Sequence, residues 1–431
     1  MAVPGRRIRI AFGALPTSGE PIVTDWVDVT DYCREVFTRS GRSQDLDRQE
    51  AATATITLDN TDGRFTPENS ASPYYPNVLP FVQVEVARLS DTLAKPFTLG
   101  HAQLGVDYAT LYTTAPSSNV IFRGLVERWK PTWYTRQGGY VTIEATDLFR
   151  FLGKKEISKT YAEQTVGARI AAVLADIVNP FPTEIDPLGV TIAGESISRN
   201  VLEYLREIAA LDGGTFEARA DGKVVFRSRE TIRTSTRWGT SQATIGDNAS
   251  EKRYAGIELS YDEQLLVNRA VGANSAATSI TAQQDLDSIA SYLERSHDLG
   301  TTAIVSITDV EQRAIDKLAL YSQPRMRVDD LAFELMDETT DSETLTALQQ
   351  ADRVTVTRRP DQGNPVTGDY HVQGVDHRIG IKTWRLGLHV AAAPPDLFIL
   401  GYAQLGTTAV LRFSVSQLVL GTGRLGSSVL G

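Results

Sequence analysis

The sequence is poor in the residue types that several common functions need. Its 431 residues include one cysteine, Cys33, so the chain has no internal disulfide and no cysteine-based zinc site. The five histidines form no HExxH or His-x-His pattern, which leaves a zinc site without support. We therefore expect no bound metal, and we expect Cys33 to be a small apolar residue in a packed strand.

Long apolar runs and an excess of positive charge are also missing. No run reaches the roughly 18–20 residues that cross a bilayer, and the apolar stretch at 8–15 is interrupted by Arg9 and Gly13. We predict a first strand there instead of a signal peptide, with synthesis in the cytoplasm and no membrane insertion. The net charge of −10 argues against a protein whose main task is to grip nucleic-acid phosphates.

The usual signatures of catalysis are missing as well. No Gly-x-Ser-x-Gly motif occurs, and Gly105, Gly124 and the pair at 138–139 lack the Lys-Ser or Lys-Thr of a P-loop. A glycosidase needs only two carboxylates, but nothing marks one pair among the 53 acidic residues. We therefore expect no enzyme, no catalytic residue and no cofactor.

The chain does contain many short strands. In residues 1–155, period-two alternation or β-branched enrichment predicts strands at 8–10, 26–29, 53–58, 81–86, 120–129 and 140–145. Clusters of Gly, Pro, Asn and Asp separate these strands, which suggests a barrel or a sandwich. From 236 to 395 the pattern is mixed, with a short helical stretch at 285–294, a helix at 310–321 and strands at 257–260, 267–271, 354–357, 370–375 and 384–390.

A small α+β domain is predicted between these parts, at 156–235. It holds a helix at 165–177 and an amphipathic helix after Ser198, a plausible N-cap, with apolar residues at helical spacing. A glycine pair ends the second helix, and an Asp-Gly pair predicts a two-residue hairpin turn. The positions expected to form structural turns here and near residue 62 are Asp62, Gly63, Gly213, Gly214, Asp221 and Gly222.

The loop around Asp59, Asp62 and Gly63 allows two interpretations. Its carboxylates suggest calcium, but an EF-hand needs further oxygen ligands and a final Glu, which the sequence lacks. A turn stabilised by Asp and Asn side chains is the interpretation we favour.

An internal repeat is the most direct feature of the sequence. FTLGHAQLG at 97–105 recurs as FILGYAQLG at 398–406, and a looser copy, LGTGRLG, occupies 420–426. The first copy belongs to an insert near 96–116, and the other two form a tail at 396–431 with few charges. We predict that the tail packs on its own chain or on a neighbouring subunit. The candidate docking residues are Leu99, Gly100, Leu104, Gly105, Leu400, Gly401, Leu405, Gly406, Leu420 and Leu425.

Several of these stretches together resemble bacteriophage tail-tip (baseplate) hub proteins, the minor tail proteins of long-tailed phages of actinobacteria. The helix–Gly-Gly–hairpin unit at 198–229 looks like the second domain of such hubs, and DGRFTP at 62–67 with SPYYP at 72–76 is the most specific local match. The resemblance continues in the order of the later elements. These are Asn268, an Asp-x-x-Ser-Ile-x-x-Tyr segment at 285–292, a helix and three late strands. Hubs often have glycine after that tyrosine, where this chain has Leu293.

The resemblance implies a multidomain β-rich fold with two β-barrel-like hub domains, 1–155 and 236–395, separated by the small α+β domain. It implies a homotrimer at the tail tip of the virion that adapts the sixfold tail tube to threefold components. The implied partners are the distal tail or tail tube protein, the tape measure protein and a central fibre or spike protein. The acidic balance is consistent with a channel through which phage DNA slides without specific binding.

Two other classes of tail protein stay open. A receptor- or carbohydrate-binding protein would use exposed aromatic residues such as Trp129, Trp133, Tyr134 and Tyr140, although we expect these to pack on a hairpin face. A cell-wall hydrolase of the tail tip is a weaker alternative, because no residues remain for a separate catalytic module.

Overall fold

The structure is a computed structural model. It describes residues 4–14, 23–42, 50–89, 118–134, 138–261, 263–335 and 340–393, and two strand pieces at 419–420 and 423–424. The chain forms two compact units. Unit 1 comprises Met1–Tyr261, Ala303–Ser306 and Met326–Ala392, and unit 2 comprises Asp262–Thr302, Ile307–Arg325 and Ala393–Gly431. The domain boundaries expected at 155, 235 and 395 stay predictions.

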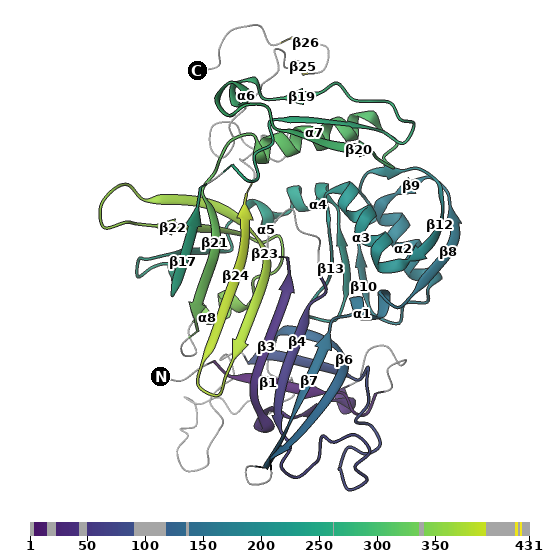
Figure 1. Cartoon of the computed structure of the whole chain (residues 1–431), viewed down its shortest axis with the longest axis vertical. Coiled ribbons are helices and arrows are strands. Elements are labelled where there is room, and N and C mark those ends of the chain that lie inside the picture. Colours follow the sequence, from purple (N-terminus) through teal and green to yellow (C-terminus); the bar gives the residue numbers. More distant parts are fainter. Residues whose placement is uncertain are drawn as a thin grey trace, which may run out of the picture. The chain divides into compact units, whose positions relative to one another are not determined.

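One continuous sheet of 14 strands dominates unit 1. Its centre is β3 (Cys33–Gly41), which pairs with β4 (Thr53–Asp59) on one side and with β23 (Val366–Ile379) on the other. Figure 1 shows purple β3 beside the yellow-green β23. The sheet therefore joins the beginning of the chain to its end, since Gly41 lies opposite Gly374.

The remaining strands extend the sheet from this junction. Along β4 the order continues with β7 (Gly138–Thr146), β6 (Ser118–Tyr134), β5 (Gln83–Leu89), β1 (Arg6–Ile10) and β2 (Val27–Asp28). Along β23 one branch runs to β22 (Arg353–Arg358), β15 (Ala243–Gly246) and β16 (Lys252–Arg253), and the other to β24 (Trp384–Ala392), β21 (Arg327–Glu334) and β17 (Gly256–Ser260). The predicted β-rich fold is confirmed, and within the part of the chain that the structure describes no barrel closes.

Alternating side chains build one core on both sides of the β3–β23 junction. Every second residue of β7, such as Val141, Ile143 and Ala145, is buried, as the period of a half-buried strand requires. Burying each large aliphatic side chain contributes about 1.5–3 kcal/mol. The same core cluster includes Ile8, Ile56, Leu58, Val84 and Val86 from the early strands and Leu331, Phe333, Trp384, Leu386 and Leu388 from the late ones.

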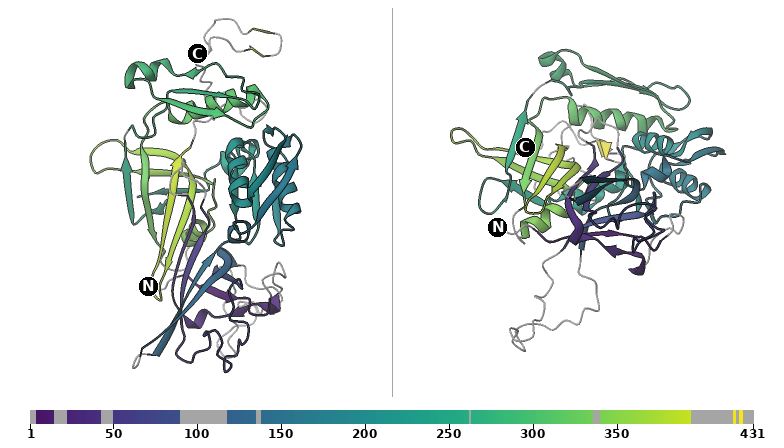
Figure 2. Two further views of the ribbon diagram at one scale, coloured as in Figure 1. Left: turned by 45° about the vertical axis from the view of Figure 1, so that its right-hand side comes forward. Right: turned by 60° about the horizontal axis from the view of Figure 1, so that its bottom comes forward.

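The α+β part of unit 1 is built on three helices and several short strands. The helices are α1 (Phe149–Leu152), α2 (Val166–Asp176) and α3 (Val201–Asp212), and α4 (Arg229–Thr234) and α5 (Thr236–Gly239) follow. The strands pair as β8 (Glu156–Tyr161) with β12 (Glu195–Asn200), β9 (Gln164–Thr165) with β11 (Thr191–Ile192), and β14 (Val224–Arg227) with both β10 (Thr183–Ile185) and β13 (Thr215–Ala218). Figure 2 shows this teal part of the chain from two further directions.

The predicted helices of this part are confirmed, but the N-cap of α3 is Asn200 and not Ser198. Ser198 lies on β12, while the Asn200 side chain accepts a hydrogen bond from the Glu203 N–H at 3.3 Å. The Asn200 amide also donates to the Gly153 carbonyl at 3.0 Å, a tertiary contact that the local sequence does not reveal. α3 ends at Gly213, whose left-handed conformation satisfies the last carbonyl groups of the helix.

Unit 2 is a small α/β layer. β18 (Arg269–Ala273) lies between β19 (Gln283–Gln284) and β20 (Ser296–Thr301), and α7 (Ile307–Tyr321) packs on β18 through buried Val310 and Ala314. α6 (Leu286–Tyr292) precedes β20, and β25 (Val419–Leu420) pairs with β26 (Gly423–Arg424). The helices predicted at 285–294 and 310–321 are both confirmed. None of the described helices combines the length and apolar character that a membrane-spanning helix needs.

Candidate functional site

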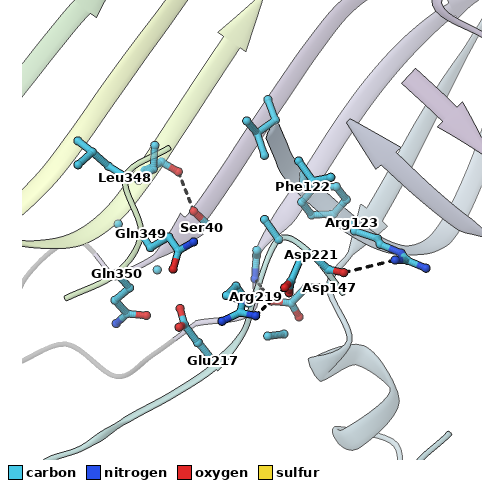
Figure 3. A pocket seen from close by; sticks show the side chains of 18 of the residues that line it. Ser40, Phe122, Arg123, Asp147, Glu217, Arg219, Asp221, Leu348, Gln349 and Gln350 are labelled. Atoms are coloured by element: carbon cyan, nitrogen blue, oxygen red, sulfur yellow. Dashed lines mark hydrogen bonds and ion pairs between the residues drawn. The ribbon is translucent and has the colours of Figure 1, made fainter. Parts of the chain in front are cut away.

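A cavity of ≈ 380 Å³ lies inside unit 1, where the large sheet meets the β13–β14 hairpin and the end of α8 (Thr340–Thr346). Figure 3 shows side chains from these elements pointing toward one another across it. Seven separate stretches of the chain contribute to its lining, and they span positions from Ser40 on β3 to His377 on β23. The polar residues at its wall include Glu50, Arg123, Asp147, Glu217, Arg219, Asp221, Gln349, Gln350 and Gln373.

The hairpin turn at Asp221 and Gly222 is held against the sheet by Arg123 of β6. The Arg123 guanidinium donates to the Asp221 carbonyl at 3.3 Å, and a Cβ on Gly222 would lie 2.9 Å from the Arg123 side chain. Gly222 has φ +87, a conformation that glycine adopts without strain. The last pair of the hairpin is Arg219 with Lys223, because the Arg219 N–H donates to the Lys223 carbonyl. The loop between them therefore has three residues, one more than the two-residue turn that we expected.

Asp147 is the most deeply buried acid of the cavity wall. Its two carboxylate oxygens accept hydrogen bonds from the N–H groups of Ala52 at 2.6 Å and Phe149 at 2.9 Å. Burial raises the pKa of this carboxyl to about 7. Asp147 therefore fastens the chain just before β4 to the start of α1, which is a structural task.

Two further acids come from the β13–β14 hairpin. Burial raises the pKa of Glu217 to about 7, and its nearest charged partner is the Arg227 guanidinium at 3.6 Å. Burial acts to raise the pKa of Asp221, but the hydrogen bond from Arg219 at 2.6 Å and the charges of Arg219 and Lys223 together outweigh it and hold the pKa below its usual value. Arg219 bonds to Glu184 as well, at 3.0 Å. These carboxylates are engaged by arginines of their own sheet.

His377 completes the titratable groups of the wall. Burial lowers its pKa to about 4, and its Nδ1 accepts a hydrogen bond from the Trp384 Nε1–H at 3.2 Å. The ring is therefore neutral at pH 7. Within the described ranges no cluster of three or more His, Cys, Asp or Glu could hold a metal ion. The cavity thus lies at a polar junction between the large sheet and the α+β part.

The loop at 59–67 forms a turn with both of its carboxylates occupied. The hydrogen bond from Arg34 at 2.5 Å lowers the pKa of Asp59 to about 2, and Asp59 also accepts from the Thr61 N–H at 3.0 Å. Asp62 accepts from the Arg64 N–H at 3.1 Å and pairs with its guanidinium. Gly63 has φ +74.

The other sequence-predicted positions fall into two groups. Gly214 lies so close to β14 that a Cβ would meet the Arg227 carbonyl oxygen at 2.3 Å. The docking residues of the repeats lie outside the described residues, except Leu420, whose backbone belongs to β25: these are Leu99, Gly100, Leu104, Gly105, Leu400, Gly401, Leu405, Gly406 and Leu425.

The four aromatic residues of the β6–β7 hairpin differ in how far they are buried. Trp129 is buried, and its Nε1–H donates to the Leu79 carbonyl at 2.9 Å, as the expected packing on a hairpin face requires. Trp133 and Tyr134, at the end of β6, are 55% and 52% exposed. The Tyr134 ring lies 5.8 Å from that of Tyr140. Both side chains still pack across the hairpin, since a Cβ on Gly139 would lie 2.7 Å from the Trp133 ring and the Tyr134 and Tyr140 hydroxyls are 3.3 Å apart, but each remains half exposed.

The fold is similar to that of known proteins, although the sequence alone finds no relative. No family model and no curated protein matches the sequence. The tail protein from Neisseria meningitidis MC58 matches in structure with a TM-score of 0.55 and 12% identity, over 90% of this chain and 96% of that one. The 43 kDa tail protein of prophage MuSo2 from Shewanella oneidensis matches with a TM-score of 0.51 and 10% identity, over 90% and 97%. The resemblance to phage tail proteins that the sequence indicates is thus confirmed at the level of the fold.

Proposed function

We propose that this chain is a structural component of a phage tail and forms a trimeric hub at the tail tip. The observation that carries the proposal is the likeness in fold to two tail proteins, which extends over 90% of this chain and nearly all of each of theirs. The sequence resemblance to hub proteins supports the more specific role. A tail-tip location and a non-enzymatic task follow from the same proposal.

The architecture of unit 1 fits a ring subunit. Two β-rich halves share one sheet through β3 and β23, so three chains would offer six β-rich halves to a sixfold tail tube. Among the described strands, β17 pairs only with β21, so its other edge is available to a neighbouring subunit. Closure of a ring would cover such edges, which otherwise invite unwanted pairing.

The remaining contacts belong to this proposal. The distal tail or tail tube protein would bind one side of the ring, and the tape measure protein and a central fibre or spike protein would bind the others. The Leu-Gly repeats at 97–105, 398–406 and 420–426 are the segments that we expect to take part in docking. Phage DNA would pass through an acidic or neutral channel without specific binding, consistent with the net charge of −10.

The purified full-length chain tests the proposal. Light scattering after gel filtration is expected to give three times the chain mass of 47.1 kDa, and negative-stain images should show a threefold ring. A monomer at every concentration tested, together with no label on the tail axis of intact particles, would contradict the hub. An inward ring of Lys and Arg in the assembled particle would contradict the proposed channel.

A second candidate function has one observation in its favour. Exposed Trp133 and Tyr134 resemble the aromatic platforms on which sugar rings stack, so a receptor- or carbohydrate-binding role is the alternative. Glycan binding by the wild-type chain, lost in Trp133→Ala, would support it. Clearing in a peptidoglycan zymogram would instead support the less favoured cell-wall hydrolase.

A further inference from the structure

α6 of unit 2 presents apolar side chains to solvent. Leu286 at its first position is 66% exposed, Leu293 immediately after its last position is 76% exposed, and Tyr292 is also exposed. We call these three residues the α6 patch. Single exposed leucines are common on protein surfaces, whereas several exposed apolar side chains on one short segment more often mark a contact site.

The backbone of Leu293 makes the patch more unusual. Leu293 has φ 65 and ψ 163, a region that is essentially restricted to glycine because a Cβ clashes with the backbone there. The side chain that causes this strain is also the most exposed of the three. Among the described residues the leucine side chain therefore costs stability and gains little burial, as is expected of a residue that contacts a further segment.

The strained turn is fixed from beneath. Asn268 is fully buried, and its amide group donates to the Leu293 carbonyl at 2.7 Å. Its side-chain oxygen accepts from the Arg295 N–H at 2.7 Å. Asn268 also donates to the hydroxyl of buried Ser288 on α6, at 3.2 Å. These bonds hold Leu293 in place, so the patch is a preformed surface.

The last described residue before the C-terminal tail is bonded to the same end of α7 as α6 is. The Ser288 hydroxyl donates to the Ser322 carbonyl at 2.5 Å, which fastens α6 to the C-terminal end of α7. At the same end, the Arg325 guanidinium donates to the carbonyls of Ala319 at 3.0 Å and of Ala393 at 3.2 Å. Ala393 and α6, through its buried Ser288, are therefore both bonded to one short stretch, residues 319–325.

The segment that follows Ala393 has the composition that such a patch would bind. Residues 394–431 carry only three charged side chains, Asp396, Arg412 and Arg424, and the Leu-Gly repeat begins at Phe398. Five residues of extended chain span up to about 17 Å, which is the reach of Phe398 from Ala393. We propose that the repeat copy at 398–406 docks on the α6 patch of the same chain.

Cysteine chemistry tests this docking in the full-length protein. The native thiol of Cys33 is buried and burial raises its pKa to about 11, so it reacts slowly. A Leu286→Cys variant therefore reports on the patch through its rate of reaction with a soluble aromatic disulfide reagent. We expect this rate to rise at least tenfold when Leu400→Asp and Leu405→Asp are added. Leu420→Asp with Leu425→Asp in the later repeat copy is the matched control and should leave the rate unchanged.

A second reporter separates docking from general unfolding. Ile381 lies in unit 1 and is 67% exposed, close to the value for Leu286. The thiol of Ile381→Cys should react equally fast with and without the repeat substitutions. Equal rates for Leu286→Cys in both backgrounds would refute the docking. Protection that disappears on dilution would also refute it and would assign the patch to the tail of a second copy. The assay needs no ring, so it can succeed or fail independently of the proposed hub.

Discussion

Arg169 offers the sharpest test of how the α+β part is held together. It lies on α2 with a fully buried side chain. Its guanidinium donates to the Tyr204 hydroxyl at 2.6 Å and to the Ala162 carbonyl at 2.7 Å, and it pairs with Glu195 at 3.3 Å. One side chain thus connects α2 to α3, to β12 and to the segment after β8.

Replacing Arg169 with alanine leaves these acceptors without their donor. Removing one partner of a buried ion pair costs about 3–5 kcal/mol, but the Glu195 side chain is 36% exposed and water can reach it. We therefore expect the lower end, about 3 kcal/mol. A loss of this much stability should raise the exchange rate of the slowest amide hydrogens of α2 and α3 roughly 10²-fold.

Hydrogen exchange followed by mass spectrometry measures the exchange rates of peptides from α2 and α3 separately from those of unit 2. The matched control is Lys223→Ala, which removes a half-exposed cation whose partners, Glu184 and Asp221, lie 3.6 and 3.9 Å away. Exposed pairs contribute about 0–1 kcal/mol, so this variant should exchange nearly as the wild type does. An effect below about 1 kcal/mol for Arg169→Ala would refute the view that the buried guanidinium connects the two helices.

Three further predictions address other parts of the chain. In the Leu400→Asp, Leu405→Asp background, where no docking contact is lost, Leu293→Gly should slow amide exchange in α6 by stabilising unit 2 by about 1–3 kcal/mol, because glycine relieves the strained backbone. No change there would show that the turn is unstrained. Glu217→Gln should leave the stability unchanged near pH 4 and raise it by up to about 3 kcal/mol at pH 8. The reason is that the folded protein raises the pKa of Glu217 to about 7. Between the usual pKa of a glutamate and pH 7, the unfolded chain therefore loses this proton while the folded chain keeps it, so the stability of the wild type falls as pH rises. Denaturant titrations of the wild type and of Glu217→Gln between pH 4 and pH 8 measure the difference. Gly214→Ala should lower the midpoint of thermal unfolding, since its Cβ would lie 2.3 Å from the Arg227 carbonyl oxygen, whereas Gly239→Ala, with open space around it, should not.

Local pattern was enough to predict most strands, the main helices and a packed strand at Cys33, but it did not predict the length of β3 at the centre of the sheet. β3 has a bulge between Cys33 and Glu35, which breaks the period of two that a regular strand shows. The charged neighbours Arg34 and Glu35 also resemble a loop. A bulge is fixed by pairing with another strand, so the residues of β3 alone do not reveal it.

The cavity was beyond sequence reasoning for a related reason. Its wall combines segments that are more than three hundred residues apart, from Ser40 to His377, and only the β3–β23 pairing brings them together. The turn at Gly222 could be predicted from an Asp-Gly pair, but its contact with Arg123 could not. Similarly, Leu293 stood out as a missing glycine, while its glycine-like conformation and its support by Asn268 required the structure.

The β3–β23 pairing also sets an order of events during synthesis. Val36 of β3 finds its partner Ile379 only after almost the whole chain has left the ribosome. At typical rates of about 5–20 residues per second, that edge waits roughly 20–70 s. Until then it is open to other chains, so a prematurely terminated product would expose an unpaired strand edge that can pair with other molecules. Chaperones or early assembly partners that cover β3 would raise the yield of native protein.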